Sequence, residues 1–109
     1  MEGLISGKSR TYDEFRSSMP SSVATLFDEL RNYCLALGKN VIEDIRMHRI
    51  VFAKSIKFRS FADIEPQRDS VIIKIKKDRK EPEKEIQIKL NDNLDEIKEL
   101  LFNAYTSIH

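Results

Sequence analysis

The feature that most constrains the fold of this chain is a change in the spacing of its apolar residues. Between residues 23 and 37 they recur every three or four positions, which is the spacing of one helix face. Between residues 41 and 90 they alternate with polar residues, which is typical of strands with one buried face. The helical spacing returns over residues 94–108. This order predicts a sheet that is covered by helices from both ends of the sequence.

Short connections between the alternating segments favour antiparallel hairpins. We therefore predict a two-layer α+β fold with an antiparallel sheet of about four strands and two long helices on one face. The predicted order is α-α-β-β-β-β-α, with a short first helix. The segments with strand character are residues 41–46, 50–54, 58–65, 71–76 and 85–90.

The first helix has a recognisable start. Thr11 and Glu14 have the spacing of a capping box, in which each side chain bonds the backbone N–H of the other residue, and this predicts a short helix over residues 12–17. Residues 1–10 hold two of the three glycines and show no apolar period. We predict a flexible N-terminal arm over 1–10 and a single α/β domain over 11–109, a length that suits one domain.

A register for the sheet follows from the alternation. Ala62 placed opposite Ile73 leaves residues 66–69 as a four-residue loop, which is an ordinary hairpin length. The side chains expected on the helix-facing side are Ala62, Ile64, Val71, Ile73, Ile88 and Leu90.

The same register defines an outer sheet face. It points Phe61 and Ile72 outward among charged side chains and places Asp63 diagonally from Lys74, near enough for a charge pair. The charged residues by themselves do not require a binding site, because the acids can simply balance a lysine-rich face that is exposed to solvent. Apolar side chains there indicate a contact surface, provided that Phe61 points away from the helices. The predicted binding residues are Arg59, Phe61, Asp63, Glu65, Gln67, Ile72, Lys74, Lys76 and Lys89.

Charge is spread unevenly along the chain. Residues 46–89 hold thirteen Lys/Arg and seven Asp/Glu, whereas the segments on either side are acidic and the whole chain has a formal charge of +1. A basic middle is explained either by attraction within the domain or by binding to a polyanion such as nucleic acid. Phe61 would then stack on a base.

Catalytic chemistry has less support in the sequence. Asp63 and Glu65 lie at alternate strand positions near Lys74, which suits a metal-dependent nuclease, but the Glu-Pro-Gln run has Gln67, and not a lysine, two residues after Glu65. The three glycines are too scattered for a phosphate-binding loop. The single cysteine, Cys34, lies within an apolar helix stripe, as a buried side chain would. We predict no catalytic residue, no metal site and no cofactor.

One stretch resembles a known domain family. Residues 61–67, Phe-Ala-Asp-Ile-Glu-Pro-Gln, are similar to the signature of an uncharacterised bacterial and archaeal family, the "predicted transport protein" C-terminal domain. Residues 26–38 resemble its Leu-Phe-x-x-Leu-Arg…Leu-Gly segment, and the closing helix with Tyr105 also fits, so the resemblance covers roughly residues 11–108.

The resemblance implies a compact α/β domain that stands alone or is attached to larger proteins, some of them nuclease- or restriction-related. It implies no catalytic residue: Asp63, Glu65, Pro66 and Gln67 match motif positions without an assigned role. Many members carry a longer segment with a Gly-His-Trp-Gly-like run before the last strand. Here residues 78–83 form a short charged stretch and the chain has no tryptophan.

These observations favour a non-enzymatic binding or interaction module that uses its outer sheet face. The expected partner is another protein or a second copy of the chain. The alternative is an accessory nucleic-acid-binding domain of a nuclease or restriction-type system, and a less favoured one is a nuclease that uses Asp63 and Glu65. No stretch reaches the ~20 apolar residues of a membrane span, and the lone cysteine is typical of a reducing compartment, so we expect a cytoplasmic protein without membrane contact.

Overall fold

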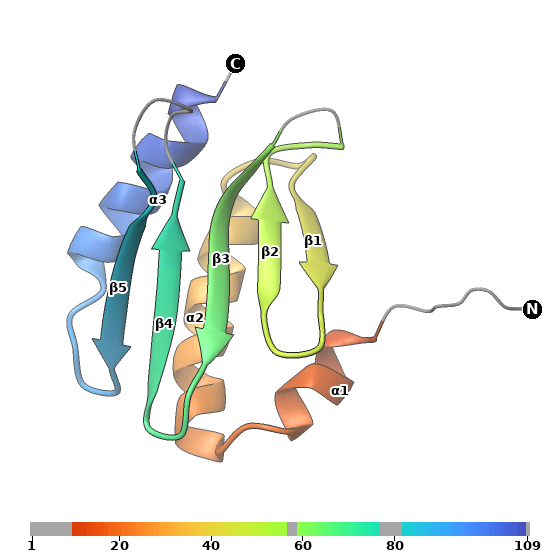
Figure 1. The fold of residues 1–109 in the computed structure, drawn as a ribbon, viewed down its shortest axis with the longest axis vertical. Helices are drawn as coiled ribbons and strands as arrows, with labels where there is room; N and C mark the ends of the chain where they lie inside the picture. The colour runs from red at the N-terminus through yellow and green to blue at the C-terminus, as the bar shows by residue number, and fades with distance from the viewer. Residues whose placement is uncertain (1–9, 57–58, 77–81, 109) are drawn as a thin grey trace, which may run out of the picture.

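The structure, a computed structural model, describes residues 10–56, 59–76 and 82–108. The predicted N-terminal arm, apart from Arg10, lies outside the described residues. The chain folds as an α+β domain with two N-terminal helices, five strands and a C-terminal helix (Figure 1). The elements are α1 (Tyr12–Ser17), α2 (Ser21–Ala36), β1 (Ile42–Ile45), β2 (Ile50–Ala53), β3 (Ser60–Pro66), β4 (Ser70–Ile75), β5 (Lys84–Lys89) and α3 (Asp95–Ser107).

Within the described residues the sheet has five strands in the order β1-β2-β3-β4-β5, and every neighbouring pair is antiparallel. The prediction of about four strands is therefore corrected to five. A tight turn makes the difference, because the N–H of Arg46 donates to the C=O of Arg49 at 2.8 Å and Met47 and His48 form the tip. The region before His48 and the region after it are thus two separate strands that pair with each other.

The two long helices cover one face of the sheet, as predicted (Figure 1). Helix α2 packs on β4, and α3 packs on β3 and β4 and also contacts α2. Between the two layers lies one apolar core, which excludes water from the helix stripes and from one sheet face. Its largest fully buried side chains include Phe15, Phe27, Phe52, Phe61, Leu30, Ile50, Ile64, Ile73, Ile88 and Leu101.

The helix ends follow local rules. The Thr11 hydroxyl accepts from the Glu14 N–H at 3.1 Å and the Glu14 carboxylate accepts from the Thr11 N–H at 2.9 Å, which confirms the capping box. Gly38 follows α2, and it also gives α3 room to approach. A Cβ atom on Gly38 would lie 2.0 Å from the Tyr105 hydroxyl, so the absence of a side chain allows this close contact.

The sheet register differs from the prediction by two residues. Ala62 pairs with Ile75 and Ile64 with Ile73, because the N–H of Gln67 donates to the C=O of Ser70 at 2.8 Å and closes a shorter turn than the predicted loop. A shift by two leaves every side chain on its original face, so the apolar pattern cannot distinguish these registers. The predicted core residues on β3 and β4 are buried as expected.

The β4–β5 register moves in the same way. Ile88 pairs with Val71 and is buried, whereas Leu90 lies beyond the end of β5. Leu90 is one of the exposed large apolar residues, so its predicted place in the core is wrong. Strand β5 ends one residue before Leu90, so the sheet does not hold Leu90 against the helices.

Phe61 does not point outward, so that prediction is wrong, and the condition that the sequence analysis set for its outer-face contact surface is not met. Phe52 pairs with Ala62 and Ala53 pairs with Ser60, so Phe61 is an extra residue in a β-bulge. A bulge interrupts the strict alternation of side chains, which turns Phe61 toward the helices. It is fully buried, and its ring meets the Tyr105 ring edge-on with centroids 5.5 Å apart.

This placement predicts that Phe61→Ala costs about 3–5 kcal/mol of unfolding free energy, since it leaves a cavity between the sheet and α3. The matched control is Phe102→Ala, because Phe102 lies on α3 with 48% of its surface exposed. The control should cost about 1 kcal/mol or less. Urea unfolding followed by circular dichroism measures both values, and equal losses would contradict the burial of Phe61.

Candidate functional site

The outer sheet face is the broad surface that the described helices leave uncovered (Figure 1). Cross-strand partners share a face, so the register identifies its residues. One row across this face runs from β1 to β5 and consists of Asp44, Val51, Asp63, Lys74 and Glu85. The next row contains Glu65, Ile72 and Gln87.

Asp63 is engaged within this face. It lies directly opposite Lys74, and not diagonally as predicted, because of the two-residue shift in register. Its closest cation is Arg49, whose Nε lies 3.3 Å from Asp63 Oδ2, and Asp63 is only 7% exposed. The contact lacks hydrogen-bond geometry, so it is a charge pair rather than a hydrogen bond. Lys74 instead reaches Glu83, with Nζ and Oε2 4.0 Å apart.

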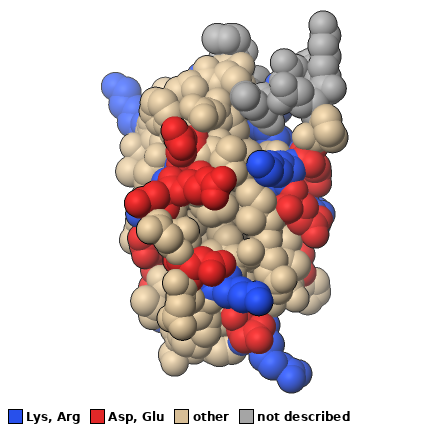
Figure 2. Space-filling model, turned by 90° about the vertical axis from the view of Figure 1, so that its left-hand side faces the viewer, with Lys and Arg blue, Asp and Glu red and all other residues tan. Residues whose placement is uncertain are grey.

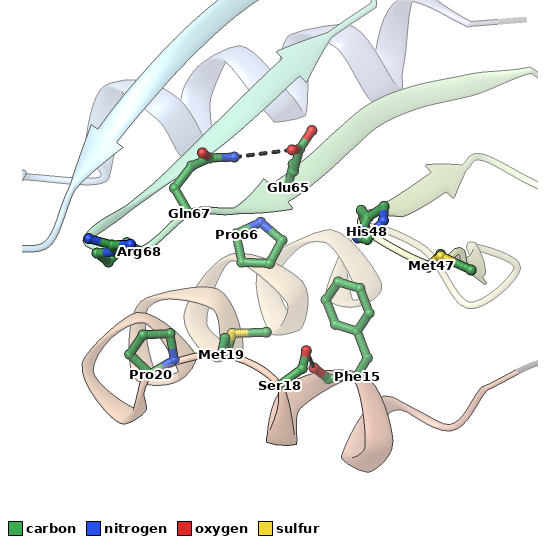
Figure 3. Close-up of a pocket in the computed structure, with 10 residues that line it drawn as sticks. All are labelled: Phe15, Ser18, Met19, Pro20, Met47, His48, Glu65, Pro66, Gln67 and Arg68. Atoms are coloured by element: carbon green, nitrogen blue, oxygen red, sulfur yellow. Dashed lines mark hydrogen bonds between the residues drawn. The ribbon is translucent and has the colours of Figure 1, made fainter.

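Glu65 and Gln67 lie at the rim of a pocket at one end of the sheet. The Gln67 Nε2 donates to Glu65 Oε2 at 3.1 Å, while Pro66 between them points toward Met19 (Figure 3). The pocket has a volume of about 580 Å³ and lies where the α1–α2 junction, the β1–β2 turn and the β3–β4 turn meet. Its lining residues are Phe15, Ser18, Met19, Pro20, Met47, His48, Glu65, Pro66, Gln67 and Arg68.

A polar cluster fixes α1, which forms one wall of this pocket. Asp28 on α2 accepts from Arg16 Nε at 3.0 Å and from the Tyr12 hydroxyl at 2.5 Å. The hydrogen bond from Arg16 is the main reason that the pKa of Asp28 is lowered. Burial, with the bond to Asp28, raises the pKa of Tyr12. The guanidinium of Arg31 lies 3.8 Å from the Tyr12 ring centre and adds a cation–π contact.

A groove crosses the β1–β2 end of the outer face, and its lining combines apolar side chains with charged ones, among them Asp44 and Arg46. Ile42 is 41% exposed and Ile56 is 87% exposed, and Val51 and Ala53 lie between them in a depression of about 420 Å³. The sequence prediction missed this groove. The sequence signal is a pair of isoleucines: Ile42 begins the first strand of the hairpin and Ile56 follows its second strand. This pair is clear only once residues 41–54 are divided into two strands.

The predicted binding residues are thus brought together in part. Asp63, Ile72 and Lys74 share the outer face, while Glu65 and Gln67 mark its boundary with the pocket. Lys76 is half-buried beyond the end of β4, where its N–H donates to the C=O of Phe61 at 2.9 Å.

The remaining two predicted residues, Arg59 and Lys89, are exposed at strand ends.

Figure 2 shows the side of the molecule with β5 and α3, where acidic and basic side chains are interspersed rather than grouped by sign. A continuous basic patch is therefore not a property of this side.

The described residues offer little for metal or thiol chemistry. Within residues 10–56, 59–76 and 82–108, no group of three or more His, Cys, Asp or Glu side chains could hold a metal ion. Cys34 is buried in the core, and burial raises the pKa of its thiol. None of the helices in the described ranges combines the length and the apolar character that a membrane span requires.

Comparisons with protein-family models, with curated proteins and with solved structures find no match for this chain. The resemblance to the uncharacterised domain family therefore remains a prediction from residues 61–67 and 26–38. The contacts described above are the basis on which a function has to be argued.

The Asp28 cluster predicts a pH dependence of stability. The folded-state pKa of Asp28 is below its ordinary value of 3.8, so its contribution is fully present above that value and is lost as pH falls through the folded pKa. Asp28→Asn should cost about 1 kcal/mol at pH 7, with partial exposure limiting the loss, and less in acid. Urea unfolding between pH 2 and 7 tests this, with Asp13→Asn on the exposed side of α1 as the control. A loss of stability that is the same at all pH values would refute the role of this carboxylate.

Proposed function

We propose that this chain is a non-enzymatic interaction module that contacts another protein through its outer sheet face. The observation that carries the proposal is the groove formed by Ile42, Val51, Ala53 and Ile56 on a face that no described helix covers. Large apolar side chains exposed together mark interaction surfaces more often than isolated ones do. Ile72 is half-buried on the same face, but it lies on β4 between Glu65 and Gln87 and is separated from the groove by β3.

The charges around this surface support contact with a protein. Arg49 pairs with Asp63 and Lys74 approaches Glu83, so each of these cations already has a carboxylate near it. Protein interfaces commonly have an apolar centre and a polar rim, and the rim charges set orientation and specificity. A groove that places Ile42, Val51 and Ile56 beside the charged side chains of Asp44 and Arg46 has this arrangement.

Nucleic-acid binding is less well supported than protein contact. Phosphate affinity requires cations that are free to replace counterions. Arg49 and Lys74 lie beside carboxylates, and Phe61, the residue expected to stack on a base, is buried against Tyr105.

The proposal is tested by site-specific photo-crosslinking in the cells that produce the protein. A benzophenone amino acid replaces Ile42 in the groove or, as the matched control, Phe102 on α3, since the two residues are similarly exposed at 41% and 48%. We expect a discrete protein adduct from the Ile42 position and none from the Phe102 position. Mass spectrometry of the adduct identifies the partner: a different protein supports the proposal, and an adduct with a second copy alone contradicts it. No adduct at Ile42, or an adduct at Phe102 alone, would contradict the proposal.

A separate measurement addresses nucleic acid. Labelled single- and double-stranded DNA and RNA should show no saturable micromolar binding at about 0.15 M salt, where weak phosphate contacts are screened. Micromolar binding that falls steeply with salt, and that Lys74→Glu weakens, would instead establish the basic part of the sheet as a phosphate-binding surface.

A further inference from the structure

Strand β1 has an open edge. Among the residues that the structure describes, it lies at the end of the sheet and pairs only with β2. In an antiparallel pair, residues alternate between those whose N–H and C=O groups point toward the partner strand and those whose groups point away. The Arg46 N–H bonds the Arg49 C=O, so Arg46 and, two residues earlier, Asp44 belong to the first kind. Glu43 and Ile45 belong to the second kind, and their backbone groups point away from the sheet.

The opposite edge of the sheet is protected. On β5 the N–H of Lys89 is bonded by the Asp92 carboxylate at 2.8 Å, and exposed Lys84 and Lys89 stand at the two ends of the strand. Charged side chains and occupied N–H groups are common devices against edge pairing. Strand β1 is short and carries the carboxylates Glu43 and Asp44, but it contains neither lysine nor proline, and no hydrogen bond within the described residues occupies the N–H of Glu43 or Ile45. The two edges therefore differ in their capacity to accept another strand.

We propose that a second copy of this chain pairs with β1 through its own β1, antiparallel about a two-fold axis at Ile45. The contact joins two five-stranded sheets into one continuous sheet. It goes beyond the proposed function, because it forms backbone hydrogen bonds along the edge of the sheet, although Asp44 and Arg46 also line the groove on the outer face.

Charge complementarity selects this register. A two-fold axis at Glu43 or at Asp44 would place that carboxylate directly opposite its own copy, which is destabilising. An axis at Ile45 instead places Asp44 opposite Arg46 of the second copy, and does so twice. Within one chain Arg46 Nε already donates to Asp44 Oδ2 at 3.1 Å, so both groups lie at the edge where a second pair of partners would meet them.

The same register suits the helix-facing side. Ile45 meets Ile45 of the second copy, which covers a side chain that is now half-buried. Met47, 71% exposed at the hairpin tip, comes opposite Glu43, whose carboxylate is held by Arg31 with an Nη2–Oε1 distance of 3.0 Å. The Met47 C=O accepts from Arg10 at 2.9 Å and retains a second lone pair for the Glu43 N–H of the second copy.

The test is sedimentation velocity on the full chain from about 1 µM to about 1 mM, a range that covers weak dimers. We expect the chain to dimerise and Asp44→Arg or Arg46→Asp alone to weaken the dimer about tenfold, because each change creates two like-charge contacts. A mixture of the two variants should recover the affinity, since each cation then meets an anion. Recovery on mixing cannot come from the Asp44–Arg46 contact within one chain, because that contact is broken in both variants.

Amide hydrogen exchange of the unmodified chain gives a second test that does not depend on the folding of any variant. The Glu43 and Ile45 amides should exchange more slowly as the concentration rises, while the Asp44 amide, which faces β2, should change little. A monomer at every concentration, or a dimer without added protection of these two amides, would overturn the proposal. In this register Ile42 comes opposite His48 of the second copy, so an Ile42 adduct with a second copy would belong to this dimer. An Ile42 adduct with a different protein is independent of it, so the two proposals can fail separately.

Discussion

The packing of both long helices on one side of the sheet is the constraint on which the rest of this structure depends. It concentrates the apolar side chains in a single core between two layers and leaves the other sheet face without cover. The bulge at Phe61 contributes directly to this one-sidedness. Strict alternation would expose the Phe61 ring, but the bulge directs it toward α3, where it contacts Tyr105. Gly38 leaves room for Tyr105 to approach. The outer face is thereby left with charged side chains and, at the β1–β2 end, with the groove that contains Ile42 and Ile56.

The helices and strands were predictable because they depend on local signals. The Thr11–Glu14 capping box and the apolar stripe of α2 require no knowledge of the rest of the chain. The register was not predictable from alternation, since shifts by two residues keep every face unchanged. The hydrogen bond from Gln67 to Ser70 decides it, and that bond depends on the conformation of the turn.

The candidate site shows where sequence reasoning fails in physical terms. A β-bulge is invisible to a period-two pattern, so Phe61 was placed on the wrong face while its neighbours Ala62 and Ile64 were placed correctly. The carboxylate of Asp63 was correctly placed on the outer face, but its partner Arg49 comes from the adjacent hairpin, which the sequence did not divide clearly into two strands. The groove at Ile42 was missed for the same reason.

The central claim, that the outer sheet face is a contact surface, is tested most directly by carbene footprinting of the chain in extracts of its own cells and in purified form. The account predicts that labelling at Ile42 and Ile56 falls in the extract, because a partner covers the groove, whereas labelling at exposed Phe102 stays the same. Equal labelling of Ile42 and Ile56 in both samples, or protection of Phe102 alone, would contradict the account and would move the contact surface to another part of the molecule.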